Sequence, residues 1–317
     1  MNDELELERQ VASLFCVGFS GLDVPSELVR LIERGVRNVI LFSRNVGPLP
    51  LLKSLIQNIK SRSVEPVAVS VDQEGGRVQR LREGFTRFAP LGELGQTADE
   101  HQAHRVGATL GRELRAVGID WDFAPVLDVD SNPLNPVIGD RSFGSDPVRV
   151  AKLGIALAQG LQSEGVASCG KHFPGHGDTH LDSHLCLPSL DHGLERLERV
   201  ELVPFRAAVS GGVASIMAAH VLFRALDAEY PASMSEPVIR GLLRERLGYS
   251  GLVVSDDLEM KAIVDHYGID DAVVRGLCAG VDTFLICHSS ERCERAIDAV
   301  VRAARNGEVP RARVQEA

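Results

Sequence analysis

The stretch Pro66-Val67-Ala68-Val69-Ser70-Val71-Asp72 is a run of β-branched and small residues that ends in one carboxylate. A short run with so few polar positions is typical of a parallel strand that is buried on both faces. Seven further runs of this kind follow the same pattern. They lie at residues 14–19, 36–42, 119–125, 166–172, 214–221, 251–256 and 281–287.

Amphipathic segments separate these runs, and their apolar spacing predicts helices. They lie at residues 49–61, 101–117, 148–164, 194–210, 237–247 and 269–279. Eight strands that alternate with helical crossovers predict an α/β protein with a single (β/α)8 TIM-type barrel, because open doubly wound sheets usually have about six strands. Residues 291–317 have room for one helix and a polar tail. We therefore expect one domain over residues 1–317, with no room for a second folded domain.

The charge balance argues against a nucleic-acid partner. The chain has 34 Lys and Arg against 44 Asp and Glu, a formal net charge of −10, whereas phosphate binding needs clustered cations. Its first six residues, MNDELE, are acidic where a signal peptide would be basic, and no apolar run is long enough to span a membrane. We expect a cytoplasmic protein without a membrane partner, as a monomer rather than an oligomer.

The cysteine pattern agrees with a reducing compartment. The six cysteines have no Cys-x-x-Cys spacing, and four of them lie in apolar segments. We therefore expect reduced thiols, with these four in the core: Cys16, Cys169, Cys278 and Cys287.

Polar side chains end several of the predicted strands. In a barrel of this type, the C-terminal ends of the strands meet at one mouth, where active sites form. A single charge there is a strand-end cap or a solvated loop residue, but several together indicate a shared pocket. The residues at these ends are Asp72, Lys171, His172, His220 and Asp256.

A histidine-rich segment follows the run at 166–172. Its histidines fall at every fourth position (172, 176, 180 and 184), and on a helix they would form one face of metal ligands. However, Pro174, Gly175 and Gly177 predict an irregular loop, which removes the geometric basis for a metal site. We expect no metal and no cofactor.

Asp182 and His184 remain in this loop as an Asp-x-His pair. A carboxylate bonded to one imidazole nitrogen fixes the tautomer and supports a proton on the other, which would make His184 a general acid. A loop histidine tied down by a neighbouring Asp would give the same pattern. At 256–257, two adjacent strand residues point in opposite directions, so we expect only one of them to face the mouth. If Asp256 keeps the pleat of the strand, it faces the substrate and Asp257 holds the following turn, but the strand alone does not settle which of them is the nucleophile.

The segment DQEGGRVQR at 72–80 combines an acid, two glycines and two arginines. It lacks the spacing of a phosphate-binding loop, so a nucleotide role has little support. Asp and Arg side chains that grasp vicinal hydroxyls would suit a sugar.

Four motifs, taken in order, carry a resemblance to a known family. They are DQEGGRV at 72–78, RSFG at 141–144, KHFPGHG at 171–177 with DSH at 182–184, and SDDL at 255–258 with Met260. This set resembles glycoside hydrolase family 3, and within it the bacterial β-N-acetylglucosaminidases of peptidoglycan recycling. The resemblance implies that Asp256 is the nucleophile, with His184 as acid/base and Asp182 as its partner. It also implies that the N-acetylglucosamine ring is bound by Asp72, Arg80, Arg141, Lys171 and His172. Many members of the family have a C-terminal sandwich domain, whereas we expect here a single catalytic domain over residues 1–317 without one.

The resemblance implies a retaining, exo-acting hydrolase that releases terminal β-linked N-acetylglucosamine from an oligosaccharide or muropeptide through a covalent glycosyl-Asp intermediate. Three alternatives stay open. The first is a phosphorylase on the same scaffold, since an imidazole repels phosphate less than a carboxylate does. The second is a metal-dependent hydrolase that uses His172, His176, Asp178 and His184. The third is a non-catalytic sugar-binding barrel, although Asp256, Asp182 and His184 are all present.

Overall fold

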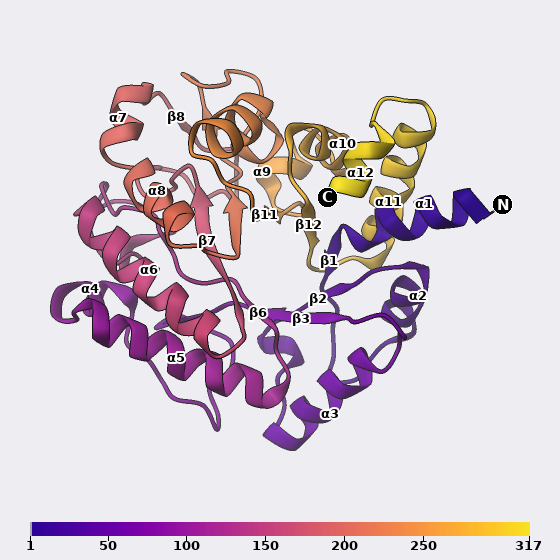
Figure 1. Cartoon of the computed structure of the whole chain (residues 1–317), viewed down its shortest axis with the longest axis horizontal. Helices are drawn as coiled ribbons and strands as arrows, with labels where there is room; N and C mark the ends of the chain where they lie inside the picture. Colours follow the sequence, from indigo (N-terminus) through magenta and orange to yellow (C-terminus); the bar gives the residue numbers. More distant parts are fainter. Residues whose placement is uncertain (1) are drawn as a thin grey trace.

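The protein is a closed barrel of eight parallel strands surrounded by helices, seen in a computed structural model that describes residues 2–317 (Figure 1). The strands follow one another around the barrel in the order β1-β12-β11-β9-β7-β6-β3-β2. Each predicted run coincides with one of them, although β7 and β11 each end one residue later than predicted, so the predicted fold class is confirmed. Their bounds are β1 (Phe15–Val17), β2 (Asn38–Leu41), β3 (Ala68–Val71), β6 (Trp121–Asp122), β7 (Ala167–Phe173), β9 (Ser215–Ala218), β11 (Leu252–Asp257) and β12 (Thr283–Ile286).

Helices return the chain along the outside of the barrel from the end of one strand to the start of the next (Figure 1). The first half of the chain contains α1 (Asn2–Ser13), α2 (Ser26–Arg34), η1 (Ser43–Asn45), α3 (Leu49–Lys60), α4 (Leu91–Thr97), α5 (Glu100–Val117), η2 (Gly139–Arg141) and α6 (Pro147–Ser163). The second half contains α7 (Leu194–Arg199), α8 (Leu202–Ser210), η3 (Ala232–Met234), η4 (Pro237–Arg246), α9 (Lys261–Val264), α10 (Ile269–Ala279), α11 (Ser290–Arg305) and α12 (Arg311–Glu316).

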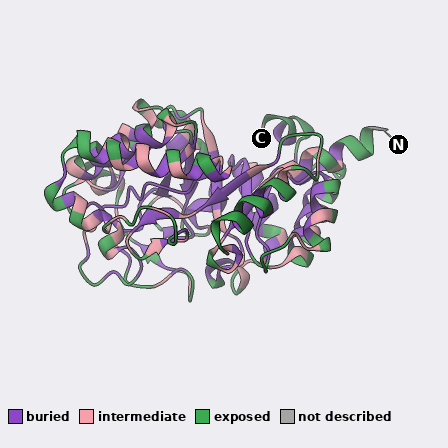
Figure 2. Cartoon of the chain, turned by 90° about the horizontal axis from the view of Figure 1, so that it is seen from below, coloured by how far each residue is buried: buried purple, intermediate pink, exposed green. Residues whose placement is uncertain are grey.

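Two layers of apolar side chains hold the barrel together, and they alternate along each strand. In β2, Val39 and Leu41 belong to the large cluster that includes the helices, whereas Ile40 between them belongs to a smaller second cluster. Met217 and Leu285 join that second cluster, and their sequence neighbours join the first. The smaller cluster therefore fills the interior of the barrel. Figure 2 shows this buried centre between the exposed outer faces of the helices.

Some elements differ from the prediction. The predicted helix at 194–210 is divided into α7 and α8, because Pro204 in the first turn of α8 has no amide hydrogen to continue a helix from α7. Residues 291–317 contain two helices, α11 and α12, rather than one helix and a tail. All six cysteines are free thiols, as expected, but Cys278 is only half-buried.

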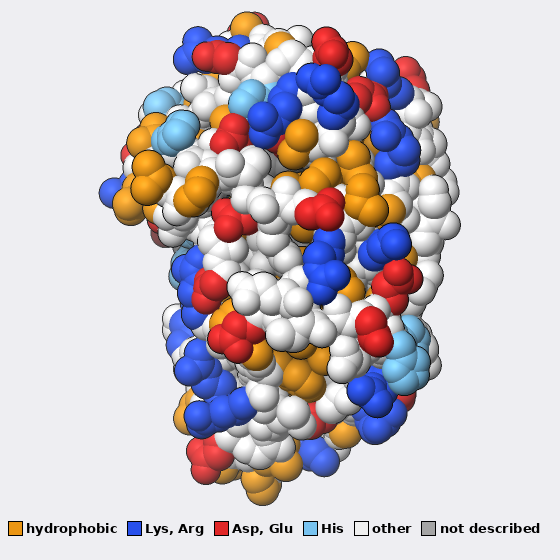
Figure 3. Space-filling view, turned by 90° about the vertical axis from the view of Figure 1, so that its left-hand side faces the viewer, with side chains coloured by type: hydrophobic (Ala, Val, Ile, Leu, Met, Phe, Trp, Pro, Cys, Tyr) orange, Lys and Arg blue, Asp and Glu red, His pale blue; other side chains and the backbone are white. Residues whose placement is uncertain are grey.

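The loops at the mouth of the barrel contain two small sheets. One pairs β4 (Gln73–Gly75) with β5 (Val78–Gln79), and the other pairs β8 (Ser189–Leu190) with β10 (Leu222–Phe223). On the face shown in Figure 3, acidic and basic side chains are interspersed. Within residues 2–317, no helix combines the length and the apolar character needed to cross a membrane.

Candidate active site

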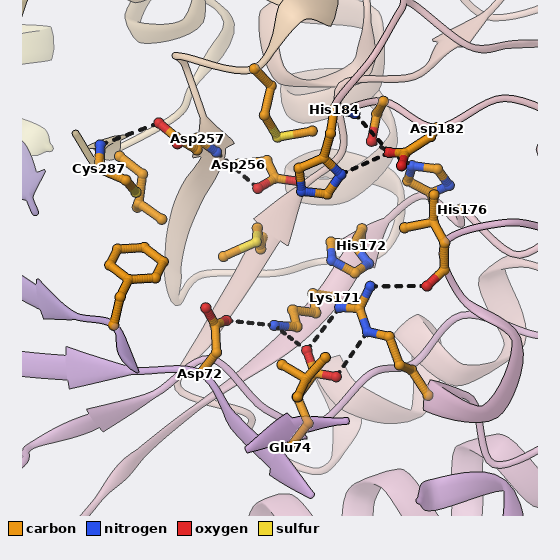
Figure 4. Close-up of a pocket in the computed structure, with 18 of the residues that line it drawn as sticks. Asp72, Glu74, Lys171, His172, His176, Asp182, His184, Asp256, Asp257 and Cys287 are labelled. Atoms are coloured by element: carbon orange, nitrogen blue, oxygen red, sulfur yellow. Dashed lines mark hydrogen bonds and ion pairs between the residues drawn. The ribbon is translucent and has the colours of Figure 1, made fainter. Parts of the chain in front are cut away.

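A pocket of about 310 Å³ lies at the C-terminal ends of the barrel strands. Its walls come from the ends of β2, β3, β7, β9, β11 and β12 and from the loops that follow them. Figure 4 shows many of these side chains pointing into one space. All eight predicted site residues line it: Asp72, Arg80, Arg141, Lys171, His172, Asp182, His184 and Asp256.

A network of opposite charges forms one side of the pocket (Figure 4). Lys171 Nζ lies 2.9 Å from Asp72 Oδ1 and 2.6 Å from Glu74 Oε1. Arg141 binds both carboxylate oxygens of Glu74, at 2.9 and 2.8 Å. Burial by itself would raise the pKa of Glu74, but the two cations outweigh it and hold that pKa well below its usual range. Arg80 approaches the outer oxygen of Asp72 at 3.5 Å.

Glu74 was not predicted as a site residue, although it lies in the quoted motif at 72–80. Its side chain is only 1% exposed, and both of its cationic partners are predicted site residues. The available signal was a second acid two positions after Asp72. The sequence alone does not show that Arg141, 67 residues further along the chain, would reach it.

Two irregularities in strand pairing bring consecutive residues to the pocket. On β7, Lys171 pairs with Met217 but Phe173 pairs with Ala218, so β7 contains one residue more than β9 over this interval. The extra residue interrupts the side-chain alternation, and both Lys171 and His172 line the pocket.

The same kind of irregularity occurs on β11, where Val254 pairs with Thr283 and Asp257 pairs with Leu285. Both Asp256 and Asp257 line the pocket, so the expectation that only one of them faces the mouth was wrong. Asp257 also holds the following turn, as expected, because its Oδ1 accepts a hydrogen bond from the Glu259 amide at 3.1 Å.

The two aspartates differ in charge state. Burial would raise the pKa of Asp256, but the nearby imidazoles of His172, His220 and His184 lower it to about 2. Burial raises the pKa of Asp257 to about 7, and the charges of Glu259 and Asp256 add to that effect. Asp256 is therefore a carboxylate at neutral pH, whereas Asp257 keeps its proton to a higher pH than an ordinary aspartic acid does.

The Asp182 and His184 pair lies on the loop after β7 and lines the same pocket as Asp256 (Figure 4). His184 Nδ1 lies 2.8 Å from Asp182 Oδ1, and the His184 amide donates to the same oxygen at 2.8 Å. The side chain of His184 is 61% exposed. Because Nδ1 is occupied, Nε2 is the nitrogen that remains to exchange a proton with a ligand.

Asp128 binds two residues of the histidine-rich segment, and it was not predicted as a site residue. Its carboxylate lies 2.6 Å from His172 Nδ1 and accepts a hydrogen bond from the His176 amide at 2.6 Å. Burial would raise the pKa of Asp128, but the interaction with His172 keeps it lowered. One buried carboxylate thus orients His172 and fixes the start of the loop.

His220 is the one strand-end residue that does not line the pocket, contrary to the sequence prediction. It is fully buried, with Nδ1 2.7 Å from Ser233 Oγ and Nε2 3.1 Å from the Asp257 carbonyl oxygen. Ser233 and the Asp257 backbone thus supply the hydrogen-bond partners that a buried imidazole needs.

The loop after Pro174 is irregular, as predicted, and its histidines have separate partners. His176 lies 2.8 Å from Thr179 Oγ1 and 2.9 Å from Ser183 Oγ, while Asp178 lies 2.6 Å from His192. Within residues 2–317, no three His, Cys, Asp or Glu side chains converge to hold a metal ion. The four residues of the metal-site alternative do not form a cluster.

The profile of the Glycosyl hydrolase family 3 N terminal domain matches residues 7–317. The chain belongs to glycoside hydrolase family 3. As a member of glycoside hydrolase family 3, it is an enzyme that cleaves glycosidic bonds. A β-hexosaminidase of Thiobacillus denitrificans is 43% identical over 274 residues, which make up 84% of this chain and 76% of that protein.

Two solved structures superpose closely on this barrel. A β-N-acetylglucosaminidase from Paenibacillus sp. str. FPU-7 matches with a TM-score of 0.96 and 42% identity, over 98% of this chain and 60% of that chain. This chain therefore spans less than two thirds of the Paenibacillus protein. NagZ from Neisseria gonorrhoeae in complex with N-trifluoroacetyl-D-glucosamine matches with a TM-score of 0.83 and 38% identity, over 90% of this chain and 84% of that chain.

Proposed function

We propose that this chain is a retaining, exo-acting β-N-acetylglucosaminidase. It hydrolyses terminal non-reducing β-linked N-acetylglucosamine from oligosaccharides or muropeptides. The names of its relatives support the sugar specificity. The observation that carries the mechanism is that one pocket contains an ionised aspartate, Asp256, and a carboxylate-supported imidazole, His184.

In the first step, a carboxylate oxygen of Asp256 attacks the anomeric carbon while the bond to the leaving oxygen breaks. The Nε2 proton of His184 passes to that leaving oxygen. Asp182 holds the ring by Nδ1 and stabilises its charged form. In the second step, water attacks the anomeric carbon, and the bond from that carbon to the Asp256 oxygen breaks, which restores the carboxylate and releases N-acetylglucosamine. Nε2 of His184 takes up the proton of the water.

An imidazole suits this pocket better than a second carboxylate. Two close carboxylates repel each other, and that repulsion raises the pKa of one of them. His184 instead contributes to the lowered pKa of Asp256. The nucleophile therefore stays ionised while the proton donor stands in the same pocket.

The charge network supplies donors and acceptors for the hydroxyl groups of the sugar. Lys171 Nζ has three donor hydrogens, and its bonds to Asp72 and Glu74 leave one for a ligand. Within residues 2–317, Nε of Arg80 is buried without a hydrogen-bond partner. We propose that Asp72, Arg80 and Lys171, together with Arg141 and His172, bind the N-acetylglucosamine ring.

Covalent trapping tests the nucleophile. The probe is a 5-fluoro N-acetylglucosaminyl fluoride, which keeps the acetamido group and slows the second step. We expect mass spectrometry of digested protein to find the adduct on Asp256, with no adduct in Asp256→Asn. Asp257→Asn is the matched control, because it makes the same change one position away and should still be labelled on Asp256. Labelling of a different residue would overturn the assignment.

The role of His184 is tested by the leaving group. His184→Ala should lower kcat/KM for N,N'-diacetylchitobiose by about 10²-fold or more, yet have little effect on a 2,4-dinitrophenyl glycoside, whose leaving group needs no proton. Equal losses would argue against His184 as the acid. The same assay with and without phosphate should yield N-acetylglucosamine. Formation of N-acetylglucosamine 1-phosphate would indicate a phosphorylase instead.

A further inference from the structure

The residue between the two members of the acid/base pair lines the same pocket, but it is buried, whereas its two neighbours are more exposed. Ser183 is 1% exposed, whereas the side chains of Asp182 and His184 are 30% and 61% exposed. The hydroxyl of Ser183 lies 2.9 Å from Nε2 of His176. Its carbonyl oxygen accepts a hydrogen bond from the Ala262 amide, at the start of α9, at 3.4 Å. Ser183 is therefore held through both its side chain and its backbone.

His176, the partner of Ser183, is itself held at several points. Its amide donates to Asp128 Oδ1 at 2.6 Å, and its Nδ1 lies 2.8 Å from Thr179 Oγ1. Burial, with a contribution from His172, lowers the pKa of His176 to about 4, so the ring is neutral near pH 7. A neutral imidazole has one donor and one acceptor nitrogen, and here each of them faces a hydroxyl group.

These contacts connect the exposed acid/base pair to the barrel. Asp128 lies beyond the end of β6 and also binds His172, the last pocket residue of β7. From Asp128 the connection passes through His176 to Ser183, which adjoins both Asp182 and His184. Within residues 2–317, the Ser183 hydroxyl makes the one side-chain hydrogen bond that joins residues 182–184 to His176.

We propose that Ser183 and His176 are positioning residues that hold the Asp182–His184 pair where it can protonate the leaving oxygen. This inference rests on the proposed function, because it concerns the geometry of the proposed acid. Neither residue exchanges a proton with the substrate. Substitutions of these two residues should therefore slow only a step that needs His184.

The first test is Ser183→Ala, which removes one oxygen atom and leaves the backbone contact in place. We expect kcat/KM for N,N'-diacetylchitobiose to fall by about tenfold. This loss is smaller than the 10²-fold or greater loss expected when the general acid itself is removed, because His184 is still present. The value for the 2,4-dinitrophenyl glycoside should change by less than about twofold, because that substrate does not need the proton. Ser183→Thr keeps the hydroxyl and should recover most of the loss.

The chain offers a matched control in Ser233, whose hydroxyl lies 2.7 Å from His220 Nδ1. Ser183 and Ser233 are both 1% exposed, and each is bonded to a buried histidine. His220, however, does not line the pocket and is bonded to the Asp257 carbonyl. Any loss in Ser233→Ala should therefore be the same for both substrates, and melting temperatures of all variants show whether they fold.

A double mutant separates this proposal from the proposed function. If Ser183 acts through His184, adding Ser183→Ala to His184→Ala should cost nothing further on either substrate. An equal cost of Ser183→Ala in both backgrounds, or an equal loss on both substrates, would overturn the positioning role. If His184→Ala itself shows no dependence on the leaving group, the proposed acid is wrong, and the failure lies with the function instead.

Discussion

Asp182 Oδ1 accepts two hydrogen bonds from His184, one from the amide and one from Nδ1, each at 2.8 Å. A single oxygen thereby fixes both the backbone and the ring of the residue that we propose as the acid. The interaction with His184 also keeps the pKa of Asp182 lowered in spite of its partial burial.

Asp182→Asn should lower kcat/KM for N,N'-diacetylchitobiose by about 10²-fold, because an amide does not stabilise a charged imidazole as a carboxylate does. Steady-state kinetics with a 2,4-dinitrophenyl glycoside provides the internal control, since this substrate should be cleaved at nearly the original rate. A comparable loss on the activated substrate would mean that Asp182 serves the pocket in another way.

Glu74→Gln should destabilise the protein by about 3 kcal/mol, because it leaves buried Lys171 and Arg141 facing a neutral amide. Urea unfolding measures this change. Glu65→Gln makes the same substitution in an exposed pair with Arg37 and should leave the unfolding midpoint nearly unchanged. If both variants unfolded at the wild-type urea concentration, the buried network would not be stabilising the folded state.

Asp257→Asn should raise the free energy of unfolding relative to the wild type, and this gain should be larger at pH 8.5 than at pH 5. The pKa of Asp257 is raised to about 7 in the folded chain, so its contribution is fully present below the unfolded value near 3.9 and is lost as pH rises through about 7. An asparagine stays neutral and avoids that loss, which we expect to be roughly 1–3 kcal/mol.

Chemical denaturation at several pH values measures this difference between Asp257→Asn and the wild type. The lowered pKa of Asp256 does not interfere, because its contribution is present above about 3.9 and is lost only as pH falls toward 2. Asp271→Asn, at an exposed position on α10, is the control. If the difference in unfolding free energy between Asp257→Asn and the wild type did not change with pH, the pKa of the Asp257 carboxyl would not be raised in the folded chain.

Gly177→Ala should displace the histidine-rich loop that follows Pro174, because the added Cβ would lie 1.8 Å from the Val129 carbonyl oxygen. We expect a lower melting temperature and a loss of activity that is greater on N,N'-diacetylchitobiose than on the dinitrophenyl glycoside. Gly193→Ala is the control, since its Cβ would meet no atom within 4 Å. Wild-type melting and kinetics in Gly177→Ala would contradict the close contact.

The barrel and most of the pocket are predictable from the sequence alone. Each strand is a short apolar run, and strands of one parallel barrel end at the same face, so Asp72, Lys171 and Asp256 have to meet there. Pro174 and Gly175 exclude a helix from local backbone constraints alone. The motifs of the histidine loop, in turn, carry the resemblance to the family.

Only the tertiary structure decided which groups support the pocket and which face it. Glu74 meets Arg141, and Asp128 meets His172, across 67 and 44 residues of sequence, and no local pattern encodes such pairs. The pairing shift on β11 likewise arises between neighbouring strands and brings Asp257 to the pocket. Strand alternation is a local property of the chain, whereas register and ion pairing depend on what packs beside it.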